Sequence, residues 1–210
     1  MSTVLHIESS PRKIRSRSIK VARVFLQEYT KYHPSDEIVT LDIWDTVLPE
    51  VNGDTLDSKY AILHGKEKTV KQIEAWGAVE RVISHFLDAD KYIFSLPMWN
   101  FGIPYKLKHF FDVIIQPGYT FSFSPEEGYK GLVKSKHACV ICARGGSYTS
   151  EDGSQELDVQ QKYMNLILGF IGITDVRPII IQPTLAGDPE QLEQVLKLAE
   201  EEARTIAREF

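Results

Sequence analysis

Hydroxyl and cationic side chains are concentrated near the amino terminus. Residues 9–18, SSPRKIRSRS, contain four serines and four cationic side chains. When such a segment leads into a helix, its hydroxyls and free backbone N–H groups form a site for an anion. The segment predicts binding of a phosphate monoester, because it has neither the GxxxxGK[ST] nor the GxGxxG pattern of nucleotide triphosphate and dinucleotide sites. The alternative is that Ser18 only caps the helix and the arginines are solvated.

Aromatic side chains and prolines are combined in a second segment, PMWNFGIP, at residues 97–104. Its two prolines and its glycine impose an unusual backbone path. Trp99 and Phe101 are large aromatic residues for a loop, where such side chains usually contact a ligand or another protein surface. A planar aromatic ligand needs this mixture of flat side chains and polar backbone groups, so the segment predicts a ring-binding loop. The alternative is that Met98 and Trp99 only cover the edge of a sheet.

A third segment, ARGGSY at residues 143–148, contains paired glycines. Gly145 and Gly146 allow the main chain to approach a ligand without an intervening Cβ atom. By itself the pattern is also that of an ordinary turn. Its position favours a role in ligand binding, because all three segments follow a predicted strand and are therefore expected at the same edge of one sheet.

The elements that position these segments alternate along the chain. Short apolar runs that end at turn residues predict five strands, at residues 4–7, 37–42, 91–96, 136–143 and 176–182. Apolar residues at three- and four-residue spacing predict helices at residues 19–29, 70–86, 105–115, 156–170 and 188–206. Residues 52–68 fit neither pattern, and residues 118–131 predict a long loop or hairpin. This alternation predicts a single α/β domain over residues 1–210, doubly wound, with a five-stranded parallel sheet between helices and ligands beyond the carboxyl ends of the strands.

Composition excludes several classes of protein. The net charge is −5 and no run of 18 apolar residues occurs, so neither a nucleic-acid partner nor a membrane span is expected. The first residues enter a strand pattern without a signal-peptide core, and there are only two cysteines, so a cytoplasmic location is expected. Cys139 and Cys142 lie in a predicted strand and point to opposite faces, which disfavours a disulfide or a shared metal. The six histidines, His64 among them, show no metal-ligand spacing, and no metal is expected.

Four segments, SSPRKIRSRS, PMWNFGIP, ARGGSY and LGFIGITDV (residues 168–176), occur together in this order. In order and spacing the chain resembles the FMN-dependent NADH-azoreductases of the flavodoxin-like superfamily, which are related to the NAD(P)H:quinone reductases. The resemblance implies an oxidoreductase that holds FMN non-covalently, one per subunit, and takes electrons from NADH. It also implies a homodimer whose active sites lie at the subunit interface.

The resemblance implies a role for fourteen residues. Those expected to hold the FMN phosphate are Ser10, Ser16, Arg17 and Ser18. Those expected around the isoalloxazine ring are Pro97, Met98, Trp99, Asn100 and Phe101, with Arg144, Gly145 and Gly146 closing over its other side. Phe123 and Phe170 match aromatic positions that line the substrate pocket. Two positions depart from the pattern: Ala143 stands where serine is frequent, and Phe123 where some relatives have tyrosine.

The implied chemistry is a ping-pong transfer of two electrons from NADH through FMN to a quinone or an azo compound, and the reductive cleavage of an azo bond gives two aromatic amines. It requires no catalytic side chain, because the cofactor carries the reaction. A flavodoxin-type electron carrier without NADH oxidation is one alternative, although such carriers are shorter and have a TxTGxT-like loop. A phosphoester hydrolase is another, without a candidate nucleophile and base. The natural acceptor and the choice between NADH and NADPH stay open.

Overall fold

The centre of the protein is a parallel sheet. The computed structural model describes residues 1–210 except 64–65, 68, 152 and 186–187. Five strands have the order β2-β1-β3-β6-β7, and every pairing among them is parallel. Their bounds are β1 Thr3–Glu8, β2 Glu37–Asp42, β3 Lys91–Pro97, β6 His137–Ala143 and β7 Asp175–Ile181. The predicted five-stranded sheet is confirmed. The strand order reverses beside β1, where folds of this type bind ligands.

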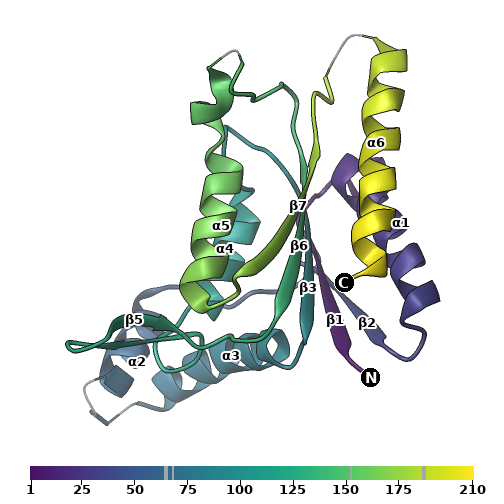
Figure 1. Cartoon of the computed structure of the whole chain (residues 1–210). Helices are drawn as coiled ribbons and strands as arrows, with labels where there is room; N and C mark the ends of the chain where they lie inside the picture. The colour runs from purple at the N-terminus through teal and green to yellow at the C-terminus, as the bar shows by residue number, and fades with distance from the viewer. Residues whose placement is uncertain (64–65, 68, 152, 186–187) are drawn as a thin grey trace.

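Helices cover both faces of the sheet (Figure 1). One face carries α1 (Arg17–Tyr32) and α6 (Pro189–Arg208), and the other carries α3 (Val70–Leu87), α4 (Tyr105–Ile114) and α5 (Val159–Ile171). The three central strands, β1, β3 and β6, are buried on both sides, so neighbouring residues enter different cores. Cys139 belongs to the α1–α6 core and Cys142 to the opposite one, as predicted, and both are free thiols. Among the described residues, no helix is long and apolar enough to cross a membrane.

The helices differ from the predictions in two places. Residues 52–68, which matched no pattern, contain α2 (Gly53–Leu63). Its buried positions include Thr55 and Ser58, and the Ser58 hydroxyl donates to the carbonyl of Gln72 at 2.9 Å, so the helix has no apolar stripe to detect. The helix predicted from residue 156 begins only at Val159, after a short 3-10 turn, η2 (Ser154–Leu157). The reason is Asp158, whose carboxylate caps α5 by accepting from the Gln161 N–H.

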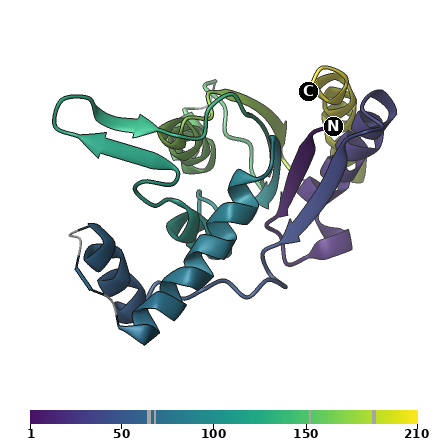
Figure 2. The same cartoon turned by 90° about the horizontal axis from the view of Figure 1, so that it is seen from below.

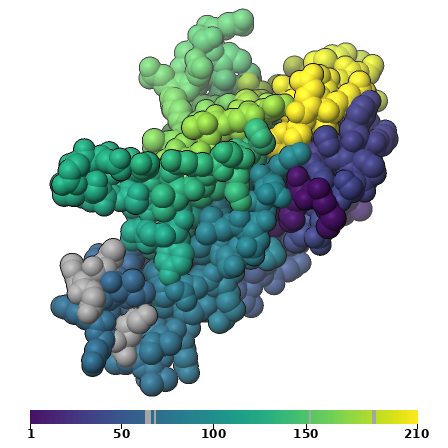
Figure 3. Space-filling view, turned by 60° about the horizontal axis from the view of Figure 1, so that its bottom comes forward, coloured from purple at the N-terminus to yellow at the C-terminus, as the bar shows by residue number. Residues whose placement is uncertain are grey.

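The segment predicted as a loop or hairpin forms an antiparallel pair, β4 (Phe121–Ser124) and β5 (Gly128–Gly131). The pair extends away from the sheet and forms a projecting lobe of the surface (Figures 2 and 3). Its base rests against the end of α5, where a Cβ atom on Gly131 would lie only 2.3 Å from the Gly172 nitrogen. Glycine is therefore required there, and it fixes the hairpin to the amino edge of the sheet.

Candidate functional site

The serine-rich segment connects the carboxyl end of β1 to the amino end of α1. All four of its serines are buried, and Ser16 is the residue that caps α1, since its hydroxyl accepts from the Ile19 N–H at 3.4 Å. Ser18 lies inside the first turn, with its hydroxyl 3.1 Å from that of Ser16. The buried Ser9 hydroxyl has no hydrogen-bond partner among the described residues. The paired hydroxyls of Ser16 and Ser18 therefore lie at the positive end of a sixteen-residue helix, which suits an anion.

The cationic side chains of this segment are not equivalent. Lys13 forms ion pairs with Asp42 and Asp45, the latter at 3.0 Å, so carboxylates at and just after the end of β2 neutralise its charge. Arg12 and Arg15 are exposed and Arg17 is half-buried, and none of them is ion-paired within the described part of the chain. Three guanidinium groups are thus available to an anion at this loop.

The segment after β3 folds into a tight two-residue turn. Trp99 and Gly102 exchange both backbone hydrogen bonds at 3.0 Å. The central residues Asn100 and Phe101 have φ angles of 48° and 68°, the left-handed pair that defines a type I′ turn. A phenylalanine in this conformation is strained, and such strain is concentrated at functional sites. The Trp99 and Phe101 rings stay 37% and 45% exposed, so their faces are open to a planar ligand.

A further aromatic residue, Trp44, supports this turn. Its ring lies 5.7 Å from that of Trp99 and meets Tyr105 edge-on at 5.4 Å. Trp44 follows the carboxyl end of β2. The three predicted segments also follow the carboxyl ends of strands, so its position in the sequence was a signal for this site as well. A cavity of about 720 Å³ opens beside the turn, with Trp99, Asn100 and Tyr105 among its lining residues. A volume of this size is in the range of small-molecule sites.

The arginine of the third segment is enclosed by the protein. The Arg144 side chain is 2% exposed and ion-paired with Asp158 at 2.9 Å. Its remaining donors reach three glutamine oxygens, those of Gln160, Gln161 and Gln182. The guanidinium therefore faces the interior and joins the start of α5 to the end of β7. The loop that follows meets the second segment, since the Tyr148 and Phe101 rings lie 6.2 Å apart, edge to face.

The two predicted substrate residues lie at the opposite edge of the sheet. The helix α5 starts beside Arg144 at the carboxyl edge and runs for thirteen residues, or about 20 Å, before it ends beside the hairpin. Phe170 is in its last turn, and Phe123 is on β4, in an aromatic cluster that includes Tyr129. Within one chain the structure does not bring these two residues to the three loops.

A buried histidine lies beneath the serine-rich loop. His6 Nε2 is 3.0 Å from the hydroxyl of Ser95, and Nδ1 is 3.9 Å from the Glu8 carboxylate. Burial, together with the nearby Arg23 charge, lowers the pKa of His6 to about 4, so the ring is neutral at physiological pH. In the part of the chain that the structure describes, no group of three acidic, histidine or cysteine side chains suits a metal; His64 lies outside the described residues.

Comparison with known proteins agrees with this architecture. A family model described as flavodoxin-like fold matches residues 2–206. An FMN-dependent NADH:quinone oxidoreductase of Desulfotalea psychrophila is 50% identical over 210 residues, which covers 100% of this chain and 98% of the relative. Among solved structures, azoreductase from Bacillus anthracis str. Sterne has a TM-score of 0.91 at 31% identity, with 100% of both chains covered.

An FMN-dependent NADH-azoreductase from Bacillus anthracis str. Ames Ancestor, solved in complex with FMN, has a TM-score of 0.87 at 30% identity. It covers 99% of this chain and 100% of its own. The predicted fold, family and enzyme class are confirmed by these likenesses, and the electron-carrier alternative is not favoured. The chain belongs to the flavodoxin-like family of FMN-dependent NADH:quinone oxidoreductases and azoreductases.

Proposed function

We propose that this chain binds one FMN per subunit and passes electrons from NADH to quinones or azo compounds. The observation that carries the proposal is that two unlike loops lie at the same edge of the sheet, after the neighbouring strands β1 and β3. One is a helix amino end surrounded by buried serine hydroxyls, and the other is a strained turn with open aromatic faces. A phosphate joined to a planar ring system matches this pair, since the first loop suits a dianion and the second a flat ring.

The residues present fit FMN. The unpartnered Ser9 hydroxyl and the Ser16–Ser18 pair at the start of α1 supply donors to a phosphate, and Arg17 adds charge. Ser9 extends the predicted set of Ser10, Ser16, Arg17 and Ser18. The turn of residues 97–101 and the main chain of residues 144–146 supply the two sides of a ring site. Arg144 takes part by holding that main chain in place.

Bound FMN supplies two-electron redox chemistry, accepting electrons from NADH and returning them to an acceptor. The protein therefore needs no nucleophile or general base. Backbone N–H groups of the two loops would stabilise negative charge on the flavin, and the aromatic side chains of the turn would exclude water from it. NADH and the acceptor would bind in turn at the same site, which would give ping-pong kinetics.

We further propose that the active unit is a homodimer. Phe123 and Phe170 lie one α5 length from the three loops of their own chain, so they reach a flavin only across an interface. Apolar side chains are exposed along α4, α5 and the hairpin, including Tyr105 at 65%, Leu166 at 70% and Tyr129 at 68%. A two-fold contact through these elements covers this surface in both copies. Two free, buried cysteines favour a reducing compartment such as the cytoplasm.

A visible absorption spectrum, recorded before and after anaerobic addition of NADH, tests the function. We expect flavin bands that bleach with NADH and return when a quinone or an azo dye is added. Bands that persist with NADH favour an electron carrier that needs a separate reductase. The absence of bands after reconstitution with FMN contradicts the flavin assignment.

A further inference from the structure

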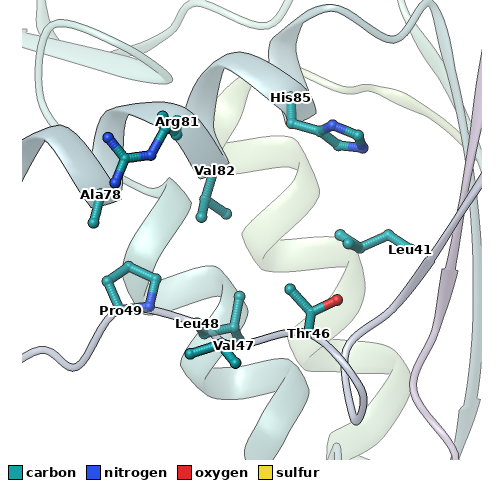
Figure 4. Close-up of a pocket in the computed structure, with 9 residues that line it drawn as sticks. All are labelled: Leu41, Thr46, Val47, Leu48, Pro49, Ala78, Arg81, Val82 and His85. Atoms are coloured by element: carbon teal, nitrogen blue, oxygen red, sulfur yellow. The ribbon is translucent and has the colours of Figure 1, made fainter.

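An apolar groove lies between α3 and the loop that follows β2 (Figure 4). Its volume is about 450 Å³, which is large enough for a small organic molecule. Val82 of α3 points toward Val47 and Leu48 of the loop across this space. Val47 is 93% exposed, so an aliphatic wall of the groove faces water. None of the residues that line the groove belongs to the site described above.

Two polar groups in the loop wall already have partners within the protein. The Thr46 hydroxyl donates to the Asp42 carbonyl at 2.7 Å. The Pro49 carbonyl accepts from His109 Nε2 at 2.8 Å. The lining of the groove is therefore mostly aliphatic, which selects for a hydrocarbon chain.

The rim of the groove is cationic. Arg81 and His85 lie one turn apart on α3, and both side chains are exposed. Neither forms a hydrogen bond or an ion pair with a residue that the structure describes. The two side chains point to opposite ends of the groove (Figure 4), and the guanidinium, with five donors and no acceptor, carries the positive charge of the rim. A hydrocarbon chain that ends in a carboxylate satisfies both the apolar walls and this rim, whereas a chain that ends in a cation is repelled.

We propose that this groove binds a medium-chain carboxylate, with its carboxylate at Arg81 and its tail between Val82 and the loop. From Ala78 to His85 the helix rises about 10 Å, which matches the length of such a tail. The proposed ligand neither fills the flavin site nor takes part in electron transfer. The proposal therefore stands or falls separately from the proposed function.

Calorimetric titration of the full-length, FMN-loaded protein with decanoate below its micelle concentration tests the proposal. We expect saturable binding of one decanoate per chain and none of decyltrimethylammonium. Arg81→Glu is expected to weaken decanoate binding at least tenfold, because it removes a charge-assisted contact and adds repulsion. Lys71→Glu is the matched control, since it makes the same charge change at an exposed position of the same helix and should leave the affinity unchanged.

A second measurement locates the ligand. Amide NMR shifts on adding decanoate are expected at Val47, Ala78 and Val82, and Ala78→Phe, which fills the groove, should abolish them. The proposal is overturned if decanoate shows no saturable binding or if Arg81→Glu binds it unchanged. Equal binding of the cationic surfactant also overturns it, as do shifts confined to the turn at Trp99. If the Ala78→Phe variant loses self-association in solution, a second copy of the chain covers the groove, and the proposal is also overturned.

Discussion

The carboxyl edge and the amino edge of this protein hold their side chains in opposite ways. At the carboxyl edge, four serines are buried, Arg144 is enclosed by four polar partners, and a strained turn fixes Asn100 and Phe101. At the amino edge, the hairpin projects from the body, and Phe123 is 58% exposed. The first arrangement is preorganised for a ligand that stays bound. The second arrangement offers exposed apolar surface, which fits the dimer interface that we propose. We propose that this difference separates the cofactor site from the acceptor site within one small fold.

The largest expected effect is on the free energy of unfolding, and it comes from comparing one ion pair at each edge. Arg144→Met leaves the Asp158 carboxylate buried without its partner, and we expect the free energy of unfolding to fall by about 3–5 kcal/mol. Lys130→Met removes the exposed hairpin pair between Lys130 and Glu127 and should cost less than about 1 kcal/mol. Urea denaturation of the two variants checks this. Similar losses in both would show that Arg144 does not anchor the carboxyl edge.

The serine-rich loop allows a substitution that keeps the fold and changes only the charge. Aspartate caps a helix as well as serine does, so Ser16→Asp should preserve α1 while it places a negative charge at the anion site. We expect the FMN dissociation constant to rise about 100-fold relative to Ser16→Asn, which caps equally well without charge. Fluorescence titration of the apoprotein with FMN measures both. Equal affinities in the two variants would place the phosphate elsewhere.

Truncating one aromatic ring at each edge should separate cofactor binding from acceptor binding. Phe101→Ala is expected to weaken FMN binding about tenfold, through loss of a ring contact. Phe123→Ala should leave the FMN dissociation constant unchanged and raise the KM for a quinone by a similar factor. Steady-state kinetics at saturating FMN distinguish the two. If Phe123→Ala also weakens FMN binding, the hairpin contributes to the cofactor site.

The smallest expected effect is a loss of stability in mild acid that arises at the carboxyl edge. Burial lowers the pKa of His6 to about 4, below its ordinary value of 6.5, although Glu8 lies 3.9 Å away. Between these values the unfolded state binds more protons, so the contribution is complete above pH 6.5 and is lost as the pH falls toward 4. From pH 7.5 to 5.5 we expect a loss of about 1 kcal/mol that His6→Asn does not show. An identical pH dependence in that variant would assign the effect to other groups.

Much of the fold followed from patterns that burial imposes. The strands that are covered on both faces appear as short apolar runs, and the three loops were found because each follows such a run. Residues 53–63 were not predicted as a helix, because small polar side chains such as Ser58 form part of its buried face.

The site was less completely predictable, because its chemistry depends on distant contacts. An arginine beside paired glycines usually faces solvent, yet Arg144 is enclosed by groups from α5 and from the end of β7. The left-handed conformation of Phe101 has no local signal, since glycine and asparagine are the residues that normally adopt it. Trp44 stands at a strand end and its position was informative, but its contact with Trp99 is tertiary.

Mixed dimers test the central claim, that a working site takes its loops from one chain and its acceptor-binding aromatics from the other. The first parent, Ser16→Asp, lacks a usable phosphate site. The second, Phe123→Arg, places a charge in the acceptor pocket at an exposed position. Coexpression with two affinity tags isolates the hybrid. The account predicts that each parent homodimer is nearly inactive in NADH:quinone reduction. The hybrid, which has one intact site, should recover about half of the wild-type activity. A hybrid no more active than its parents would contradict it and place both groups in the same chain's site.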